Sequence, residues 1–459
     1  MSEKNEFEKE FIELETEQLT EALDGDQIDV FRSLFLELHP YDQAKFFGKI
    51  SQEQRVKLYH FLSPEEMAGI FENVNTDEED YETYLSEMDS TYVADMLGQM
   101  YADDAVDVLN ELDKDQVAGY LSIMDVHAAQ EIRELLHYDE YTAGSIMTTE
   151  FIAIEANQTA RSAMQILKNE APMAETIYYV YVINEDKRLV GVLTLRDLII
   201  ADEDTMISEI TNERVVSVSV SEDQEEVART MRDYNFLAVP VVDQQNHLLG
   251  IITVDDIIDV IDEEASDDYS KLAGISDVDG ADRHSFASAK KRLPWLIILL
   301  FLGMLTANLI GRFEETLDQV SILAVFIPLI AGMAGNTGTQ ALAVAIRRIA
   351  TGDVLNESKI KLIIREAGTG LITGSVCGIL IMGIVFFWKS NLFLGMLVGL
   401  SVLITLIVAT LAGALVPLIM HKCKVDPAVA SGPFITTIND IISILIYLGL
   451  ATVFMNFLL

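Results

Sequence analysis

The chain has 459 residues, of which 50% are hydrophobic and 23% are charged, and its net charge is −42. The acidic excess lies before residue 290, in a segment with 65 acidic and 19 basic residues. The remainder of the chain has 8 acidic and 12 basic residues. Such a charge repels nucleic acid and attracts cations, which excludes nucleic acid as a partner. The two cysteines, Cys377 and Cys423, form no CxxC pair, so neither a disulfide framework nor a zinc site is indicated.

Residues 1–140 show apolar residues at helical spacing and no strand pattern. Short breaks, such as HPYD at 39–42 and LSPEE at 62–66, divide this acidic N-domain into a predicted superhelix of short helices. Asp103 and Asp107 are four residues apart and can face one ion together, although a solvated helix face explains any single pair of this kind. The N-terminus has no apolar signal-peptide core, so we expect the first 289 residues to stay in the cytosol.

Residues 145–262 contain an internal repeat. A glycine, a threonine and an aspartate recur 59 positions apart, in the pairs Gly191/Gly250, Thr194/Thr253 and Asp197/Asp256. Each copy has the periodicity of a strand, a helix, a strand, a turn, a strand and a helix. The two copies resemble a tandem pair of cystathionine-β-synthase (CBS) domains, which we place at 141–204 and 205–262.

The resemblance to CBS domains implies an adenine nucleotide in the cleft between the copies. The segment GVLTLRD at 191–197 supplies Asp197 at a helix start, suited to accepting ribose hydroxyls. The alternative is that Asp197 only caps its helix. Tyr179 and Phe236 are candidates for stacking on the base, although aromatic residues at such positions also serve as core.

An acidic run, VDDIIDVIDEEASDD at 254–268, follows the repeat. In a helix, one face would carry Asp256, Asp259, Glu263 and Asp267, with Glu264 and Asp268 beside them. Like charges at this spacing destabilise a helix, so a cation is expected against the stripe. We place a connecting helix at 263–289, between the CBS pair and the membrane, and expect it to couple the two mechanically.

Five apolar stretches follow the basic cluster at 290–292, at 294–311, 317–345, 367–388, 392–420 and 428–457. Each is long enough to span about 30 Å of hydrocarbon as a helix. Residues 290–459 contain twelve basic residues, and ten of them lie before the first stretch or in the second and fourth loops. Because basic loops tend to stay on the cytosolic side of a membrane, this distribution predicts a cytosolic N-terminus and an external C-terminus. Residues 290–459 are therefore predicted to form a multi-pass domain of the cytoplasmic membrane.

The fifth stretch contains one acid, Asp440, next to Asn439. Ionisable residues within a membrane are costly and tend to mark ion pathways, although such an aspartate can also be protonated or bond to a neighbouring helix. No basic residue lies within the apolar stretches, so a transported cation is the expected partner. The second stretch contributes oxygens through GMAGNTGTQ at 332–340, and its glycines allow close helix approach. A carboxylate with carbonyl and amide oxygens suits a hard cation such as Mg²⁺.

Other classes of protein fit less well. No HExxH motif occurs and no histidine lies deep in an apolar stretch, so an intramembrane metalloprotease lacks its ligands, and we predict no enzyme activity. An acidic pore residue disfavours a chloride channel. A broader divalent-cation transporter for cobalt or manganese, or a membrane-anchored magnesium or nucleotide sensor, remains an alternative.

The whole chain resembles the MgtE family of magnesium channels. The motifs that carry the resemblance are ETIYYVYVIN (175–184), GVLTLRDLI (191–199), DQEEVAR (223–229), the acidic connecting stretch, AGNTGTQ (334–340) and DPAVASGPFITTIND (426–440). The expected fold is a multidomain α and α/β membrane protein with an α-superhelical N-domain, a tandem CBS pair, a connecting helix and five transmembrane helices. The resemblance also implies a homodimer in membrane lipid, with the pore on the two-fold axis.

The resemblance assigns roles to individual residues. It makes Asp440 the pore aspartate and Asp426 the aspartate at the pore entrance. It places regulatory magnesium at Asp103, Asp107, Asp223, Glu225, Asp256, Asp259, Glu264, Asp267 and Asp268. It places ATP, as a regulatory ligand, at Tyr179, Arg196, Asp197 and Phe236. Asn235 stands where an acidic regulatory ligand is expected, which puts that one position in doubt.

The implied mechanism is gating by intracellular magnesium. At low magnesium the acidic domains of two subunits repel one another and the pore is open. As magnesium rises, it bridges carboxylates between domains and subunits, and the pore shuts from the cytosolic side. Magnesium acts only through its higher affinity for the closed state.

Overall fold

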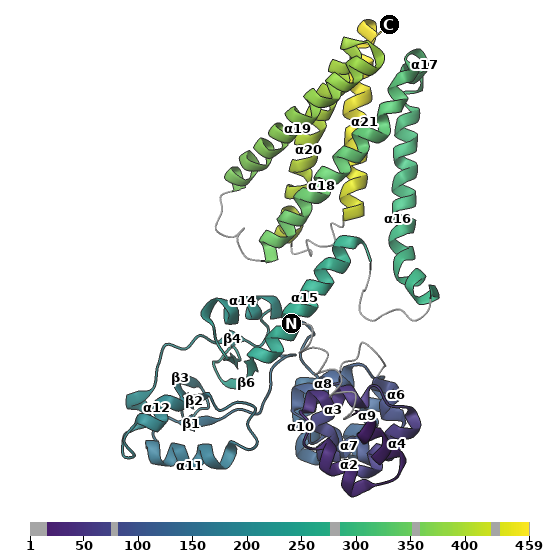
Figure 1. Ribbon diagram of the computed structural model, residues 1–459. Helices are drawn as coiled ribbons and strands as arrows, with labels where there is room; N and C mark the ends of the chain where they lie inside the picture. Colours follow the sequence, from purple (N-terminus) through teal and green to yellow (C-terminus); the bar gives the residue numbers. More distant parts are fainter. Residues whose placement is uncertain (1–15, 75–80, 276–284, 351–358, 424–431, 459) are drawn as a thin grey trace, which may run out of the picture. The chain divides into compact units, whose positions relative to one another are not determined.

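The computed structural model describes residues 16–74, 81–275, 285–350, 359–423 and 432–458. The chain divides into two compact units, Met1–Asp262 and Glu263–Leu459, and Figure 1 shows the elements of each. Asp426, the predicted pore-entrance residue, lies outside the described residues.

The N-domain is built from short helices, as the sequence pattern predicts (Figure 1). Their starts are set by local capping: Ser51 and Ser63 form capping boxes with Gln54 and Glu66, and His39 caps a helix whose first residue is a proline. The helices are α2 (Ile28–Phe35), α3 (Pro40–Phe47), α4 (Gln52–Phe61), α5 (Pro64–Phe71), α6 (Tyr81–Ser86), α7 (Ser90–Leu97), α8 (Ala102–Asn110), α9 (Lys114–Ile123) and α10 (Val126–Leu135).

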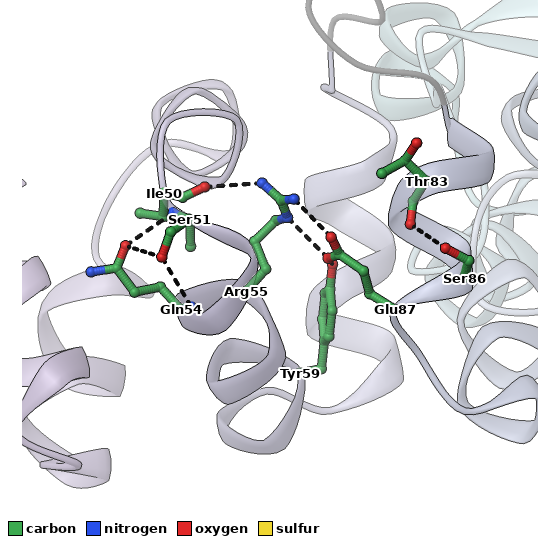
Figure 2. A network of polar contacts seen from close by, with 8 residues as sticks. All are labelled: Ile50, Ser51, Gln54, Arg55, Tyr59, Thr83, Ser86 and Glu87. Atoms are coloured by element: carbon green, nitrogen blue, oxygen red, sulfur yellow. Dashed lines mark hydrogen bonds and ion pairs between the residues drawn. The ribbon is translucent and has the colours of Figure 1, made fainter.

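A buried ion pair connects helix α4 with the segment that follows α6. Arg55 on α4 donates two hydrogen bonds to the Glu87 carboxylate, at 3.0 and 2.7 Å, and a third to the carbonyl of Ile50 (Figure 2). The hydroxyl of Tyr59 donates to the same carboxylate at 2.9 Å. The side chains of Arg55 and Glu87 are only 6% and 1% exposed. Removing either partner alone would leave an uncompensated buried charge, which strongly destabilises a protein.

The CBS pair consists of two three-stranded sheets with the same topology. In each, the first two strands are parallel and the last two antiparallel, and the register pairs Val182 with Gly191 in one sheet and Val241 with Gly250 in the other. The strands are β1 (Ala153–Glu155), β2 (Tyr179–Ile183), β3 (Leu189–Thr194), β4 (Val218–Ser219), β5 (Ala238–Val242) and β6 (Leu248–Thr253). The helices are α11 (Ala160–Glu170), α12 (Leu195–Ile200), α13 (Ile207–Ile210) and α14 (Gln224–Tyr234), with α15 following β6.

The repeat seen in the sequence has a local structural cause. After β3, Thr194 caps α12 and Asp197 closes the capping box; after β6, the Asp256 carboxylate accepts from the backbone and hydroxyl of Thr253 in the same way. The order of elements is the one that the periodicity predicts. One hydrophobic core joins the N-domain to the second CBS repeat, and includes Leu109, Val227 and Ile257.

The acidic run after the repeat is helical. Helix α15 extends from Val254 to Ala273, so residues 263–273 of the predicted connecting helix continue the last helix of the CBS pair. No proline or glycine interrupts the run before Gly274, which adopts a left-handed conformation with φ of 72°. Residues 276–284 lie outside the described residues, and the next helix begins at Ser285.

Five helices of the second unit are long and apolar enough to cross a membrane, which confirms the predicted number of transmembrane helices for the described residues. Helix α19 begins eight residues before the predicted stretch, because the charged segment 359–366 continues the helix beyond its apolar part. The elements are α16 (Ser285–Gly311), α17 (Glu314–Gln319), the 3-10 turn η1 (Ser321–Phe326), α18 (Ile327–Ala350), α19 (Lys359–Lys389), α20 (Leu392–Lys422), α21 (Gly432–Val453) and α22 (Met455–Leu458).

Glycines let these helices approach closely. A Cβ atom on Gly378 of α19 would lie 2.6 Å from the carbonyl oxygen of Gly399 on α20, and the reverse distance is also 2.6 Å. Helices α18 and α20 meet where Gly413 approaches the carbonyl of Gly338. Small residues at crossings are the usual basis of helix packing in lipid, where no hydrophobic force draws helices together.

Candidate functional site

Helix α8 carries the acidic pair that the sequence singles out, and the structure separates its two members. Asp103 is 8% exposed, whereas Asp107 is exposed. The Oδ1 atom of Asp103 is buried and has no hydrogen-bond partner among the described residues. Burial and the neighbouring carboxylates of Asp104 and Asp256 raise the pKa of Asp103 well above its ordinary value.

Asp104, which the sequence analysis did not select, belongs to the same cluster. Burial, followed by the nearby charges of Glu72 and Asp256, raises the pKa of Asp104 to about 8. Asp107 contributes to the same shift, so it lies near the cluster without being buried in it. Desolvation and like charges both disfavour the ionised form of a carboxyl group, and here they act together.

The CBS pair supplies the other carboxylates. Asp256 lies in the first turn of α15, where its Oδ2 atom accepts hydrogen bonds from Thr253 at 3.1 and 2.5 Å. Burial raises the pKa of Asp256 to about 6 in spite of these bonds. Glu175, from the segment before β2, has its pKa raised to about 7 by burial and by the charge of Asp256.

Glu175, Asp255 and Asp256 form a compact group. Each offers one carboxylate oxygen, and these three atoms all lie within 4.8 Å of one another. The neighbours that raise the pKa values of Asp103, Asp104, Glu175 and Asp256 are carboxylates. Several carboxylate oxygens gathered in this way make a donor set for a hard divalent cation.

The remaining predicted regulatory positions in the first unit lie at helix ends and exposed faces. Asp223 caps α14 by accepting from the backbone of Glu225 at 3.0 Å, and Glu225 pairs with Arg229 at 3.3 Å. Asp259 is exposed on α15, and its pKa is raised by partial burial and by Asp262. Asn235 ends α14 in the left-handed conformation, with φ of 54°. Asparagine tolerates that conformation better than most residues, which gives the departure at this position a structural reason.

Three predicted positions lie on the later part of α15, in the second unit. Glu264, Asp267 and Asp268 are all half-buried. Asp267 forms an ion pair with Lys271, one turn along the helix. A pair at this spacing partly offsets the repulsion within the acidic stripe.

The predicted nucleotide residues are distributed over both CBS repeats. Tyr179 begins β2 and packs on a small core shared by the two repeats, which includes Ala238. Phe236 stacks on Tyr234, with ring centroids 5.3 Å apart and planes 7° from parallel. Arg196 and Asp197 are exposed. The Asp197 carboxylate is engaged in the cap of α12, where it accepts from Thr194, and its second oxygen is left for other partners.

In the membrane unit, Asp440 lies on α21 directly after Asn439, the residue whose amide lies against Gly338 of α18. Its Oδ1 atom is buried and lacks a hydrogen-bond partner among the described residues. The neighbouring Asn439 is 1% exposed, and both of its amide atoms are also without partners there. Gly335 and Gly338 face α21, whereas Gly332 faces open space, so only two of the three predicted glycines serve this crossing. Three orphaned polar atoms at membrane depth need water or an ion.

The sequence alone does not predict that Glu175, Asp255 and Asp104 belong to the acidic cluster. Glu175 stands within the motif ETIYYVYVIN, but no periodicity connects it to Asp256, which lies in the other repeat. Asp104 adjoins a selected residue, and a helical wheel places it on a neighbouring face. The packing of α8 against the CBS pair brings these carboxylates together.

Three family matches cover most of the chain. Residues 327–450 match the MgtE family, described as a divalent cation transporter. Residues 38–141 match the MgtE intracellular N domain, and residues 143–204 and 207–263 match the CBS domain.

Curated relatives match along nearly their whole length. The magnesium transporter MgtE of Enterococcus faecalis is 54% identical over 457 residues, covering 100% of both chains. The proteins of the same name from Bacillus subtilis and Thermus thermophilus are 41% and 35% identical, and the alignments cover 93% and 94% of this chain and 94% and 97% of theirs.

Two solved structures resemble the first unit. One is the soluble part of a magnesium transporter, with 57% identity and a TM-score of 0.54, covering 55% of this chain and 99% of that one. The other is the cytosolic domain of the Mg²⁺ channel MgtE in complex with ATP, with 37% identity and a TM-score of 0.50, covering 53% and 99%. The chain therefore belongs to the MgtE family of divalent cation transporters, whose curated members named here are magnesium transporters.

Proposed function

We propose that this multi-pass membrane protein is a magnesium channel that intracellular magnesium closes by binding to its acidic cytosolic domains. The observation that carries the proposal is the cluster of Asp103, Asp104, Glu175 and Asp256, which gathers carboxylates from the N-domain and both CBS repeats. Carboxylates that are buried together repel one another, so a divalent cation would stabilise the packed arrangement.

The packed arrangement is the closed state in this proposal. Without magnesium, the like charges favour separation of α8 from the CBS pair, and with it a different position of α15. Since Asp256 lies in the first turn of α15, cation binding acts directly on a helix whose later part belongs to the second unit. The ion shifts the equilibrium only by its difference in affinity between the two states. Asp107, Asp223, Glu225, Asp259, Glu264, Asp267 and Asp268 are proposed as further regulatory positions.

The proposed pore is lined by α18 and α21, with Asp440 as the residue that attracts the cation. Its support is a buried carboxylate oxygen that has no hydrogen-bond partner among the described residues, next to Asn439, which packs against Gly338 of α18. Mg²⁺ dehydrates reluctantly, so one carboxylate acting through retained waters suits it. Asp426 is proposed as the entrance residue, as the resemblance to the family implies. No catalytic role is proposed for any residue.

The assembly and its orientation are also proposals. The distribution of basic residues favours a cytosolic N-terminus and an external C-terminus. Exposed apolar side chains on the membrane helices, such as Phe301 at 70% and Phe387 at 84%, require cover by lipid or by a second copy. A homodimer with the pore on its two-fold axis would cover part of this apolar surface, and it is the assembly that the family resemblance implies.

ATP is proposed as a regulatory ligand in the cleft of the CBS pair. The cytosolic domain of a related channel was solved with ATP. In this chain Tyr179 and Phe236 offer half-buried rings, and Arg196 offers an exposed guanidinium. Asp197 has one carboxylate oxygen that its helix cap does not use.

The test of gating is magnesium flux in proteoliposomes at low and high magnesium on the cytosolic side. The parent should conduct at low magnesium and be inhibited at high magnesium. Asp256→Ala combined with Asp259→Ala should conduct at magnesium concentrations that silence the parent. Asp186→Asn, an exposed carboxylate in the turn after β2, is the matched control and should be inhibited like the parent. Unchanged inhibition in the double variant would refute the gating proposal.

A further inference from the structure

Helices α19 and α20 of the membrane unit enclose a groove of about 400 Å³, which we call the α19–α20 groove. Its lining residues fall within 374–382 of α19 and 396–403 of α20. The lining side chains are apolar except for that of Ser375, whose hydroxyl donates to the carbonyl of Leu371 at 2.7 Å. The groove therefore suits an apolar occupant.

The groove lies beside a contact between the two backbones. A Cβ atom on Gly374 would lie 2.9 Å from the carbonyl oxygen of Leu403, so α19 has no room for a side chain at this point. Beside the contact, Ile379 and Leu400 line the groove and are 64% and 42% exposed. Atoms that line an empty hollow lose dispersion contacts. Since the groove lies within two candidate membrane spans, lipid or a neighbouring helix must fill it.

Basic side chains lie beyond one end of the groove. Lys361, in the first turn of α19, and Lys422, at the end of α20, are both exposed. They lie at the same end because successive glycines of α19 meet the residues of α20 in reverse order, as in an antiparallel pair. Arg365 and Glu366 form an ion pair of 3.3 Å and together add no net charge. The two lysines therefore make this end of the groove positive.

The opposite end carries less charge. Between residues 383 and 398, Lys389 is the only charged residue in the sequence. Its ammonium group lies 4.3 Å from the centroid of the Trp388 ring, which already offers it an electrostatic partner. Basic sites between membrane helices bind anionic lipid headgroups, so the end with two lysines is the better place for one.

The distance from the basic end to the groove matches the length of an acyl chain. Arg365 precedes Gly374 by nine residues, which corresponds to about 14 Å along a helix. One leaflet contributes about 15 Å of hydrocarbon, half of the membrane core. Gly368 lies between them, and no described atom is within 4 Å of its Cβ position, so α19 leaves the path open. A chain that starts at the basic end therefore reaches the groove.

We propose that an anionic glycerophospholipid binds at this site, with its phosphate beside Lys361 and Lys422 and the end of one acyl chain in the α19–α20 groove. A membrane helix of a second copy would fill the hollow as well, but its apolar span would bring no negative charge to the lysines. The lipid satisfies the apolar groove and the basic end together. This inference is independent of magnesium gating.

Photo-crosslinking of the full-length protein in nanodiscs tests the site. The nanodiscs consist of phosphatidylcholine with a small fraction of phosphatidylglycerol that carries a diazirine near the end of one acyl chain. Peptide mapping should find the label within residues 374–382 and 396–403. A phosphatidylcholine with the same diazirine should label these segments at least about fivefold less, because it lacks the net charge that the lysines attract.

Two changes examine the two parts of the site. Ser375→Phe should fill the groove and remove the label, whereas Val376→Phe, an exposed neighbour that does not line the groove, should keep it. Lys361→Gln combined with Lys422→Gln should weaken labelling by phosphatidylglycerol about fivefold for each lysine lost. Lys389→Gln is the matched control at the other end and should label like the parent.

The lysine variant also guards against misfolding, because both side chains are exposed and its melting temperature in pure phosphatidylcholine should equal that of the parent. Equal labelling by the two lipids, or labelling that the lysine variant retains, would overturn the proposal. So would labelling that Lys389→Gln alone reduces, since the headgroup would then lie at the other end. An unlabelled groove, with an assembly that Ser375→Phe dissociates in light scattering, would assign the groove to a second copy instead.

Discussion

The side-chain amide of Asn439 lies where a side chain at residue 338 would have to be placed. A Cβ atom built on Gly338 would be 1.9 Å from Asn439 Nδ2, closer than any real contact. The glycine of α18 and the asparagine of α21 are thus complementary in size, and the fit sets how closely the two helices approach. Because Asp440 follows Asn439 directly, the same fit positions the carboxylate that we propose for the pore.

Gly338→Ala should therefore disrupt the crossing of α18 and α21. Overpacking of this kind costs typically about 1–3 kcal/mol, and we expect magnesium flux in proteoliposomes to fall with it. Adding Asn439→Ala should remove the clash and restore part of the thermal stability and flux. Gly332→Ala is the control, since nothing lies within 4 Å of its Cβ position. If Gly338→Ala is as active as Gly332→Ala, the size match has no role in the pore.

Asp440→Asn should abolish magnesium flux while the protein remains folded. The amide keeps the shape of the side chain but removes the negative charge that attracts the cation into the membrane. Flux into proteoliposomes at low cytosolic magnesium measures the effect, together with size-exclusion behaviour as a folding check. Asp318→Asn on α17 is a matched change outside the candidate spans and should conduct normally. Equal flux in the two variants would mean that Asp440 is a packing residue.

In the absence of divalent cations, stability of the cytosolic domains should fall as the pH rises from about 5 to 8. The folded pKa values of Asp256, Glu175 and Asp104 are raised to about 6, 7 and 8, while unfolded carboxyl groups titrate near pH 4. Between these limits the folded state binds more protons than the unfolded state, so the free energy of unfolding decreases with rising pH. This stabilisation is complete below the unfolded pKa and is lost as the pH passes through the folded pKa values.

Thermal unfolding of the protein in a chelator, scanned across this pH range, measures the slope. Millimolar Mg²⁺ should flatten it, because the cation replaces the protons that leave the cluster. Asp104→Asn should also have a shallower slope in chelator, since it removes one of the groups with a raised pKa. A melting temperature that rises with pH in chelator would contradict the arrangement of the cluster.

Arg55→Met should destabilise the N-domain by about 3–5 kcal/mol, because it leaves the buried Glu87 carboxylate without its partner (Figure 2). The exposed pair of Arg161 and Glu203, at 65% and 71% exposure, provides the control, and Arg161→Met should cost no more than about 1 kcal/mol. Denaturant unfolding followed by tryptic cleavage within residues 16–135 reports the difference. If the double variant Arg55→Met with Glu87→Leu recovers stability, the loss in Arg55→Met comes from the unpaired Glu87 carboxylate. If Arg55→Met and Arg161→Met lose the same free energy of unfolding, the buried charge is not the cause.

Much of this protein is determined by local sequence. The capping residues Ser51, Ser63 and Thr194 start their helices through contacts with residues three positions away, so the helix boundaries follow from short stretches of chain. The apolar runs that form α16 and α18–α21 are long enough to be recognised by length and hydropathy. The 59-residue repeat likewise revealed two sheets of one topology, since each copy carries its own strands and cap.

The acidic cluster and the polar helix crossing were decided by tertiary structure. Asp103 and Asp107 look equivalent in sequence, but the packing of α8 buries only Asp103 and draws Asp104 in beside it. Glu175 meets Asp256 only because the two CBS repeats fold against each other and against the N-domain core. Burial and charge neighbours are set by contacts between distant segments, and the local propensities that determine helices and strands carry no information about them.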